Sequence, residues 1–361
     1  MKHQTDSLSV AVFLGGRSVE HPVSCTSGTE AANALEGQGH QVHRIGITRD
    51  GAWILLGQEH SQLVIANGQL PEVTPDAGKP VYLSTDPSGP RIVDSDGKSI
   101  GDIDVAFPAL HGPWGEDGTV QGLFEMAALP YVGSNVLASS ASMDKIFAKR
   151  VMAAEDIPQC DYMEISAHEE VNVQHVTDQL GLPLFVKPAR AGSSLGISKV
   201  TSPDQLTAAI AKAREIDPKL IVESGFSDVR EVEVGVLQRL DGEVETTYPL
   251  EVLELGSEGW FDFDAKYLGS DEPFNLTPDF PAGVAQQLQD VARRVFKALD
   301  CRDIARVDCF LDQAGQVYLN EINTMPGLTP VSGVPQAFKK AGLTYPEIVD
   351  RLVRRAAARG A

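Results

Sequence analysis

The sequence predicts a protein of mixed α/β and α+β class with three domains. Its 361 residues exceed the size at which one hydrophobic core usually keeps growing, so two or three domains are expected. The first part alternates short apolar runs, glycine-rich loops and helical segments, which is typical of an open parallel sheet. A later stretch alternates acidic and apolar residues, as antiparallel strands do. We place the domains at residues 1–137, 138–224 and 225–361.

In the first domain, the apolar run 9–14 stops at two glycines and reads as a buried parallel strand that leads into a loop. Further strands are expected over 41–47 and 103–110, with helices over 24–35 and 120–128. Residues 58–99 are rich in Gly, Pro, Asp and Ser, and we interpret them as a surface insertion without chemistry.

The second domain is expected to begin with one helix over 138–156. It continues with strands over 162–165, 184–187, 197–200 and 220–223 and with helices near 169–180 and 204–216. The third domain opens with the alternating stretch 231–236. It adds strands over 246–253, 304–311 and 316–320 and closes with a helix over 345–358.

The composition limits the classes of partner and the compartment. A net charge of -20 disfavours binding to nucleic acid or to anionic membranes, so a nucleotide site must be locally basic. The four cysteines show no CxxC pair and no metal-ligand spacing, which indicates buried free thiols in a reducing compartment. The N-terminal apolar run is too short for a signal peptide or a membrane span. We therefore expect a cytoplasmic protein.

The most informative segment is a predicted hairpin near the C-terminus. Two strands joined by Asp312-Gln313-Ala314-Gly315 would bring Asp308 close to Glu321, with Asn323 on the same face. Carboxylate and amide oxygens are hard ligands that suit Mg²⁺. Arg306 shares a face with Asp308 and could neutralise charge on a transferred phosphoryl group. An exposed hairpin with alternating polar residues is the alternative.

Lysines and a small-residue loop indicate a nucleotide site. Lys187 ends an apolar strand and is followed by the loop Gly192-Ser193-Ser194-Leu195-Gly196, and Lys145 lies upstream. Such a loop can present N–H groups and hydroxyls to phosphates and close over them, although it lacks the spacing of a P-loop. A lysine at a strand end more often reaches solvent. The magnesium hairpin downstream favours nucleotide binding.

Three further segments follow strand ends, where open sheets bind ligands. Glu20, after Gly15-Gly16, could receive an ammonium group or be a solvated loop acid. His111 could be a general base, an orienting group or a hydrogen-bonded structural histidine. Gly327 could present its N–H to an oxyanion.

Together these segments resemble the D-alanine–D-alanine ligases of the ATP-grasp superfamily. The matches run in order over nearly the whole chain: GGRSVEHPVS, HGPWGEDGTVQG, YVGSNVLASSASMDK, FVKPARAGSSLGISKV, FDFDAKY, ARVDCFL and NEINTMPGLTP. The resemblance implies the three-domain ATP-grasp architecture, ATP as co-substrate, and two Mg²⁺ ions that Mn²⁺ can replace. Its further implications are a D-alanyl phosphate intermediate, a homodimer, and a place in peptidoglycan synthesis.

The resemblance also implies roles for the matching residues. Lys145 and Lys187 would contact the phosphates of ATP, under a lid loop with Ser193, Ser194 and Gly196. Lys266 would be a further cofactor-binding residue. Glu223 and Phe226 would contact the adenine, and Glu231 would contact the ribose. Two Mg²⁺ would be held by Asp308, Glu321 and Asn323, and the transferring phosphate would be stabilised by Arg306. The first D-alanine would be bound by Glu20, Ser193, Tyr267 and His111, the oxyanion by Gly327, and the second D-alanine by Ser332.

Two alternatives remain open at this point. Another ATP-grasp ligase would share the nucleotide residues and differ on the substrate side, where Glu20, His111 and Tyr267 argue against it. A regulatory protein that binds nucleotide without catalysis would lack a metal ligand or Arg306, yet these residues are present.

Overall fold

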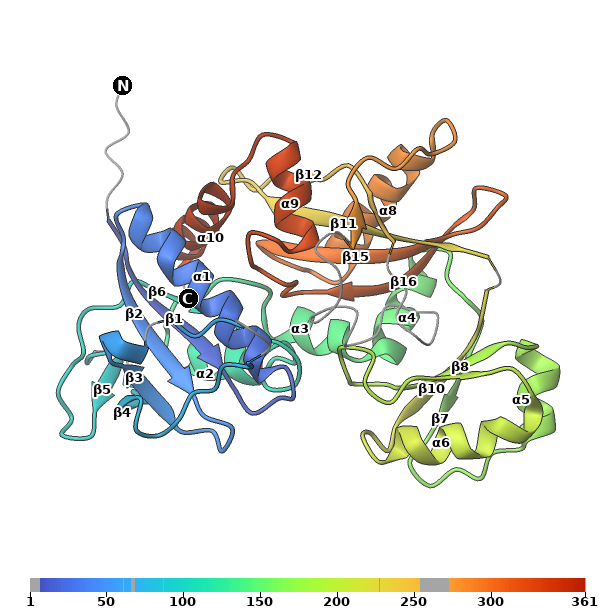
Figure 1. The fold of residues 1–361 in the computed structure, drawn as a ribbon, viewed down its shortest axis with the longest axis horizontal. Helices are drawn as coiled ribbons and strands as arrows, with labels where there is room; N and C mark the ends of the chain where they lie inside the picture. Colours follow the sequence, from blue (N-terminus) through green and yellow to red (C-terminus); the bar gives the residue numbers. More distant parts are fainter. Residues whose placement is uncertain are drawn as a thin grey trace.

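Three β-sheets follow one another along the chain, each with helices packed against it (Figure 1). The computed structural model describes residues 7–60, 62–65, 69–86, 88–226, 228–253 and 273–360. In Figure 1 the first sheet lies at the left, the second at the lower right and the third across the upper part. This arrangement agrees with the predicted mixture of α/β and α+β structure.

The first sheet contains six strands in the order β5-β4-β3-β2-β1-β6. Its strands are β1 (Ser9–Gly15), β2 (Gln41–Ile47), β3 (Trp53–Leu56), β4 (Gly78–Leu83), β5 (Ile92–Asp94) and β6 (Val105–Pro108). Only β1, β2 and β6 run parallel, whereas β3, β4 and β5 pair antiparallel. The three strands predicted for this sheet are therefore parallel, as expected. Strands β3, β4 and β5, which were not predicted as part of it, extend the sheet in antiparallel pairing, because a connection as short as residues 48–52 reverses the chain.

The segment 58–99 is part of this sheet. It contributes β4 and β5, and three of its residues, Val73, Val81 and Ile92, are at most 2% exposed. The prediction of a surface insertion is therefore wrong, because its apolar residues form only short runs, such as Val81-Tyr82-Leu83, between turn-forming residues and give no periodic signal. Helices α1 (His21–Gly37) and α2 (Thr119–Met126) follow β1 and β6.

Between the first and second sheets the chain forms two helices, α3 (Val136–Met143) and α4 (Lys145–Ala154). One helix was expected over 138–156. The interruption lies at Asp144, whose carboxylate accepts hydrogen bonds from the N–H groups of Ile146 and Phe147, both at 3.1 Å. A short acidic side chain in extended backbone satisfies the free N–H groups of a new helix, which ends α3 and begins α4.

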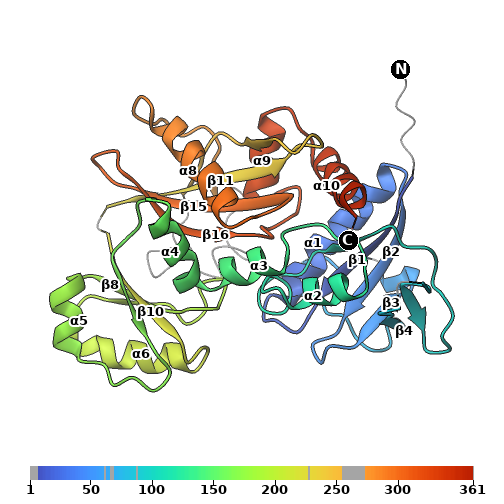
Figure 2. The ribbon, with the colours of Figure 1, turned by 180° about the vertical axis from the view of Figure 1, so that it is seen from behind.

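The second sheet has the order β7-β10-β8-β9 and is antiparallel throughout. Its strands are β7 (Tyr162–Ile165), β8 (Leu184–Pro188), β9 (Ser198–Val200) and β10 (Leu220–Ser224), and its helices are α5 (Val173–Leu180) and α6 (Leu206–Arg214). Both helices lie over the outer face of the sheet (Figure 2).

The third sheet is antiparallel and joins β14-β13-β11-β15-β16, with β12 paired to β11. Its strands are β11 (Arg230–Gln238), β12 (Val244–Thr246), β13 (Leu250–Val252), β14 (Phe274–Asn275), β15 (Ile304–Leu311) and β16 (Val317–Asn323). One face packs against α8 (Val284–Ala298), a helix that we did not predict. Its buried residues nevertheless recur at helical spacing, at positions 284, 288, 291, 292 and 295.

The chain ends with α9 (Gly333–Lys340) and α10 (Tyr345–Arg359). Helix α10 packs beside α1, far from it in sequence, and both views show this contact (Figures 1 and 2). Val349 and Leu352 of α10 share a core with Val10 and Val12 of β1. The C-terminal segment is thereby fixed to the first sheet.

Two composition-based expectations can be compared with the structure. All four cysteines are buried and have free thiols, as predicted. In the described part of the chain, no helix combines the length and apolarity needed to cross a bilayer.

Candidate active site

One face of the third sheet carries charged and amide side chains. The register places Glu233 beside Asp308 and Asp308 beside Glu321, and it pairs Arg306 with Asn323. Residues directly opposite each other, and residues two apart on one strand, project from the same face. These five side chains therefore lie on one side of the sheet, while the apolar residues between them pack into the core on the other. A β-bulge directly after Asp308 ends this regular pairing.

Arg306 is the fixed cation of this polar face. Its Nε lies 2.7 Å from Asp308 Oδ1, its Nη2 lies 2.7 Å from Asp308 Oδ2, and its Nε lies 3.4 Å from Glu233 Oε1. Burial lowers the pKa of Arg306, but the charges of Asp308 and Glu233 outweigh burial and raise this pKa. Arg306 is thus a permanently charged group held by two carboxylates.

Two lysines reach the same region from other elements. Lys145, at the start of α4, places its Nζ 3.1 Å from Glu321 Oε2 and donates to the Ala191 carbonyl at 3.0 Å. Lys187, on β8, places its Nζ 2.5 Å from Glu223 Oε2 and 3.4 Å from Asn320 Oδ1. Lys187 therefore joins the second sheet to the third by a hydrogen bond, and Lys145 joins the loop after β8 to β16.

Glu223 is held by a second lysine that the sequence reasoning missed. Lys149 Nζ lies 2.8 Å from Glu223 Oε1, and both side chains are almost fully buried. Burial raises the pKa of Glu223, but the charges of Lys187 and Lys149 outweigh it and lower the pKa to about 2. The available signal was the spacing of Lys145 and Lys149, since residues four apart share one face of a helix.

Two adjoining cavities open onto this polar face. The first has a volume of about 560 Å³ and the second about 380 Å³. They share Arg306, Glu321, Lys145 and Ser193 in their walls. A group bound in one cavity can therefore contact a group bound in the other across Arg306 and Glu321.

The first cavity is closed on one side by a contact between distant segments. The Ser193 hydroxyl donates a hydrogen bond to the carboxylate of Glu20, the residue just before α1. The two residues are 173 positions apart in the sequence. Gly112 packs beside them at φ +74°, and an added Cβ would lie 2.2 Å from Glu20 Oε2. The positive φ favours glycine there, and a side chain at this position would have to displace the Glu20 carboxylate.

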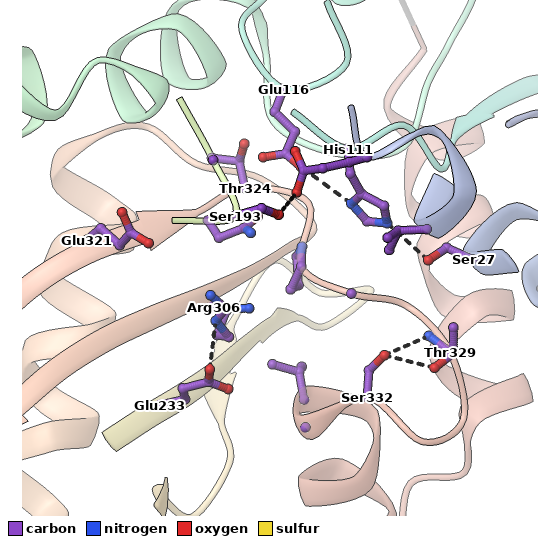
Figure 3. A pocket seen from close by; sticks show the side chains of 18 of the residues that line it. Ser27, His111, Glu116, Ser193, Glu233, Arg306, Glu321, Thr324, Thr329 and Ser332 are labelled. Atoms are coloured by element: carbon purple, nitrogen blue, oxygen red, sulfur yellow. Dashed lines mark hydrogen bonds and ion pairs between the residues drawn. The ribbon is translucent and has the colours of Figure 1, made fainter. Parts of the chain in front are cut away.

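His111 lies behind this contact in a buried hydrogen-bond network (Figure 3). Its Nδ1 donates to the Met325 carbonyl at 3.1 Å and lies 3.4 Å from Glu116 Oε1, while Ser27 Oγ lies 3.0 Å from Nε2. Burial lowers the pKa of His111, but its interactions with Glu116 outweigh burial and raise this pKa. Burial itself raises the pKa of Glu116. Ser27 was not predicted as part of the site, and Glu116 was noted only within its motif.

The loop between β16 and α9 forms the opposite wall of the first cavity. Ser332 Oγ accepts a hydrogen bond from the Thr329 N–H at 3.2 Å and lies 2.8 Å from Thr329 Oγ1, as Figure 3 shows. Gly327 is close by, since an added Cβ would lie 3.2 Å from Ser332 Oγ. Gly327, Ser332 and Asn323 all line this cavity.

The second cavity is lined by charged and by aromatic side chains. Its charged residues include Lys187, Glu223, Glu231 and Asp308. Phe226 and Phe310 also line it, and the Phe226 ring lies 4.7 Å from the Tyr318 ring and 5.8 Å from the Phe310 ring, measured between centroids. This combination suits a ligand that carries phosphates on one side and a flat ring on the other.

The loop 192–196 lies over this cavity with Ser193, Ser194 and Leu195 in its wall. Ser193 and Ser194 both have positive φ values, of 48° and 57°. Gly196 does not line either cavity. Its own φ is +74°, and it packs against Pro188 and Ile216, so its role is to turn the loop.

The donor set on the polar face fits a hard divalent cation. Asp308, Glu321 and Asn323 offer two carboxylates and one amide, of which Asn323 Oδ1 already accepts a hydrogen bond from the Met325 N–H at 2.9 Å. Within the described ranges, no three His, Cys, Asp or Glu side chains gather as a metal site. Oxygen donors of this kind match the preference of Mg²⁺. Two predicted residues, Lys266 and Tyr267, lie outside the described residues.

Comparison with known proteins identifies relatives of the whole chain. The family models "D-ala D-ala ligase N-terminus" and "D-ala D-ala ligase C-terminus" match residues 9–134 and 151–354. D-alanine–D-alanine ligases of Mycolicibacterium paratuberculosis and Mycobacterium tuberculosis are 44% and 42% identical, over 97% of this chain and 97% and 96% of theirs.

Solved structures give the same result. The D-alanine–D-alanine ligase of Coxiella burnetii matches with a TM-score of 0.82 and 30% identity, over 98% of this chain and 96% of that one. The VanG D-Ala:D-Ser ligase of Enterococcus faecalis matches with a TM-score of 0.83 and 32% identity, over 97% of this chain and 100% of that one.

Proposed function

The chain belongs to the D-alanine–D-alanine ligase family, and we propose that its two adjoining cavities are the substrate and nucleotide halves of one active site. The family's reaction joins two D-alanine molecules with the consumption of ATP, which is consistent with synthesis of peptidoglycan precursors. The fold is that of the ATP-grasp ligases. The observation that carries our proposal is the pair of residues, Arg306 and Glu321, that both cavities share.

In the nucleotide half, the cations that line the second cavity would bind the phosphates of ATP. Lys145 and Lys187 supply the positive charge, and the loop with Ser193, Ser194 and Gly196 covers it. The carboxylates of Glu223 and Glu231 and the ring of Phe226 would bind adenosine. Lys266, outside the described residues, is proposed as a further nucleotide contact on the resemblance alone.

Two Mg²⁺ ions would be held by Asp308, Glu321 and Asn323, the last of which lines the substrate half. Bound Mg²⁺ would offset phosphate charge and make the terminal phosphoryl group more electrophilic. Two of these ligands are occupied by ion pairs with Arg306 and Lys145. Both cations would also bind phosphate oxygens, so the metal ligands and the phosphate-binding residues would be neighbours.

In the substrate half, Glu20 would bind the ammonium group of the first D-alanine and is held in place by Ser193. Tyr267, outside the described residues, is proposed as a second partner there. The buried His111 would face the carboxylate of the first D-alanine. Ser332 would bind the carboxylate of the second D-alanine, and the Gly327 N–H would face the oxyanion.

The chemistry then runs across the boundary between the cavities. A carboxylate oxygen of the first D-alanine attacks the γ-phosphorus of ATP, and ADP leaves. The amine of the second D-alanine, having lost a proton, attacks the acyl carbon of the D-alanyl phosphate, and inorganic phosphate leaves. Arg306 stabilises the charge of the phosphoryl group in transfer, and the closed loop protects the acyl phosphate from water.

Three broader proposals concern the chain as a whole. We propose domains at residues 1–137, 138–224 and 225–361, a homodimer, and a cytoplasmic location, which the free buried cysteines favour.

The direct test is phosphate release from ATP and Mg²⁺, with D-alanine, L-alanine, D-lactate and D-serine offered in turn. D-Alanine alone should support release together with formation of the dipeptide. An equal response to L-alanine would reject the substrate assignment. D-Serine is a necessary comparison, because one structural relative is a D-Ala:D-Ser ligase.

A further inference from the structure

Lys149 lies behind the wall of the second cavity. It stands on α4, one turn after Lys145, and its Nζ is 2.8 Å from Glu223 Oε1. Lys187 holds the other oxygen of the same carboxylate at 2.5 Å, from the cavity side. Lys187 and Glu223 line the cavity, whereas Lys149 faces a small void between α4 and β16. Lys149 therefore touches the carboxylate from behind and is out of reach of a ligand in the cavity.

The three groups carry one negative and two positive charges in a buried place. Side-chain exposure is 4% for Lys149, 3% for Glu223 and 10% for Lys187. A buried carboxylate that loses its counter-ion is strongly destabilised, by several kcal/mol in typical proteins. If Lys187 were the sole partner of Glu223, the movement of Lys187 to a phosphate would leave the buried carboxylate without a counter-ion and would incur this full destabilisation. With Lys149 in place, Glu223 keeps a counter-ion after the transfer.

We propose that Lys149 is a positioning residue of the nucleotide site, the permanent counter-ion of Glu223 that lets Lys187 exchange this carboxylate for a phosphate oxygen. The inference rests on the assignment of the second cavity to ATP. It deepens that assignment by giving the buried lysine a role in phosphate binding. Lys149 acts on the nucleotide through Glu223 and Lys187 and makes no contact with it.

The test compares ligands with and without phosphates. Inhibition constants (Ki) are measured against ATP for adenosine and for the non-hydrolysable β,γ-methylene analogue of ATP, in the native enzyme and in Lys149→Met. The variant should raise the Ki of the analogue about tenfold or more, because Glu223 then retains Lys187. The Ki of adenosine should change less than about twofold, because Glu223 keeps Lys187 as its counter-ion and remains a charged contact for adenosine. Equal changes for both ligands would show a merely structural role and overturn the proposal.

A double variant tests the route of the effect. In a Glu223→Gln background no carboxylate holds Lys187, so adding Lys149→Met should raise the Ki of the analogue less than about twofold. A penalty as large as in the native background would overturn the proposal. This double variant removes both members of the Lys149–Glu223 ion pair together, and it therefore also serves if Lys149→Met alone fails to fold.

Two controls complete the design. Arg150→Met makes the same kind of change one residue later on α4, where Arg150 forms an exposed ion pair with Glu164, and it should leave both Ki values unchanged. Lys187→Met separates the two proposals. If it leaves the Ki of the analogue unchanged, the ATP assignment of the cavity fails. If it raises this Ki while Lys149→Met does not, only the role of Lys149 fails.

Discussion

The two cavities are built from different kinds of interaction. In the second cavity every predicted cation that the structure describes already has a protein carboxylate: Lys187 has Glu223, Lys145 has Glu321, and Arg306 has Asp308. In the first cavity, Ser193, Ser27 and Ser332 make hydrogen bonds from two loops and from helix α1, which come from distant parts of the chain.

This difference indicates two modes of ligand binding. A nucleotide entering the second cavity must replace protein carboxylates as the partner of each cation, so binding is an exchange of ion pairs. A D-alanine entering the first cavity adds contacts to groups that are already oriented. Replacement of a charged residue in the second cavity should therefore reduce activity more than replacement of a neutral residue in the first cavity.

The largest effect is expected for Arg306→Met. The change leaves Asp308 and Glu233 without the cation between them and removes the charge that faces the phosphoryl group. We expect kcat to fall about a thousandfold. Steady-state kinetics measure this, with circular dichroism to verify the fold. A folded variant with kcat within tenfold of the native value would remove Arg306 from the transition state.

The next effect concerns stability and pH. The pKa of Glu223 is about 2 in the folded protein, below its ordinary value of 4.5. As the pH falls below 4.5, the unfolded chain takes up a proton that the folded chain refuses. Stability from this residue is thus complete above pH 4.5 and is lost toward pH 2, by up to about 3 kcal/mol.

Urea denaturation at pH 6, 4.5 and 3 measures this dependence. The variant Glu223→Gln has no carboxylate to titrate at this position, so its stability should fall less steeply over the same range. Parallel pH dependence in the native protein and the variant would show that the Lys149–Glu223–Lys187 group does not control acid stability.

A smaller effect is expected for Glu20→Gln on the substrate side. The amide can still accept the hydrogen bond of Ser193, so the loop contact persists while the negative charge is lost. We expect KM for the first D-alanine to rise about thirtyfold, with KM for ATP within twofold. A comparable rise in KM for ATP would show that the two cavities do not bind separate ligands.

The smallest effect should come from Ser27→Ala. This change removes one neutral partner of His111 and leaves the contacts of Nδ1 with Met325 and Glu116. We expect the activation free energy to rise by about 1 kcal/mol, which is roughly a fivefold loss in kcat/KM for D-alanine. A loss as large as that of Arg306→Met would contradict the contrast between the two cavities.

The same contrast decides what could be predicted from the sequence. Strand β15 was predicted with its observed bounds, and the positions of Arg306 and Asp308 on one face follow from the two-residue period of a strand. The partner strand follows after a short turn, so Glu321 was also expected beside Asp308. Local pattern was sufficient because these residues lie on one hairpin.

Other features depend on contacts between distant segments or on single side chains. The pairing of Ser27 with His111 spans 84 residues, and no local pattern encodes it. The break between α3 and α4 depends on one capping side chain, Asp144. Lys149 was missed although it is four residues after Lys145, because a buried lysine needs a partner such as Glu223 that only the tertiary structure supplies.

The most direct measurement follows an oxygen atom across the boundary between the cavities. The enzyme is given ATP, Mg²⁺ and D-alanine labelled with ¹⁸O in its carboxylate, and the released phosphate is analysed by mass spectrometry. A substrate carboxylate that reaches the γ-phosphorus beside Arg306 should leave one ¹⁸O atom in phosphate for each dipeptide formed. Dipeptide formation with unlabelled phosphate would contradict a single active site that spans both cavities.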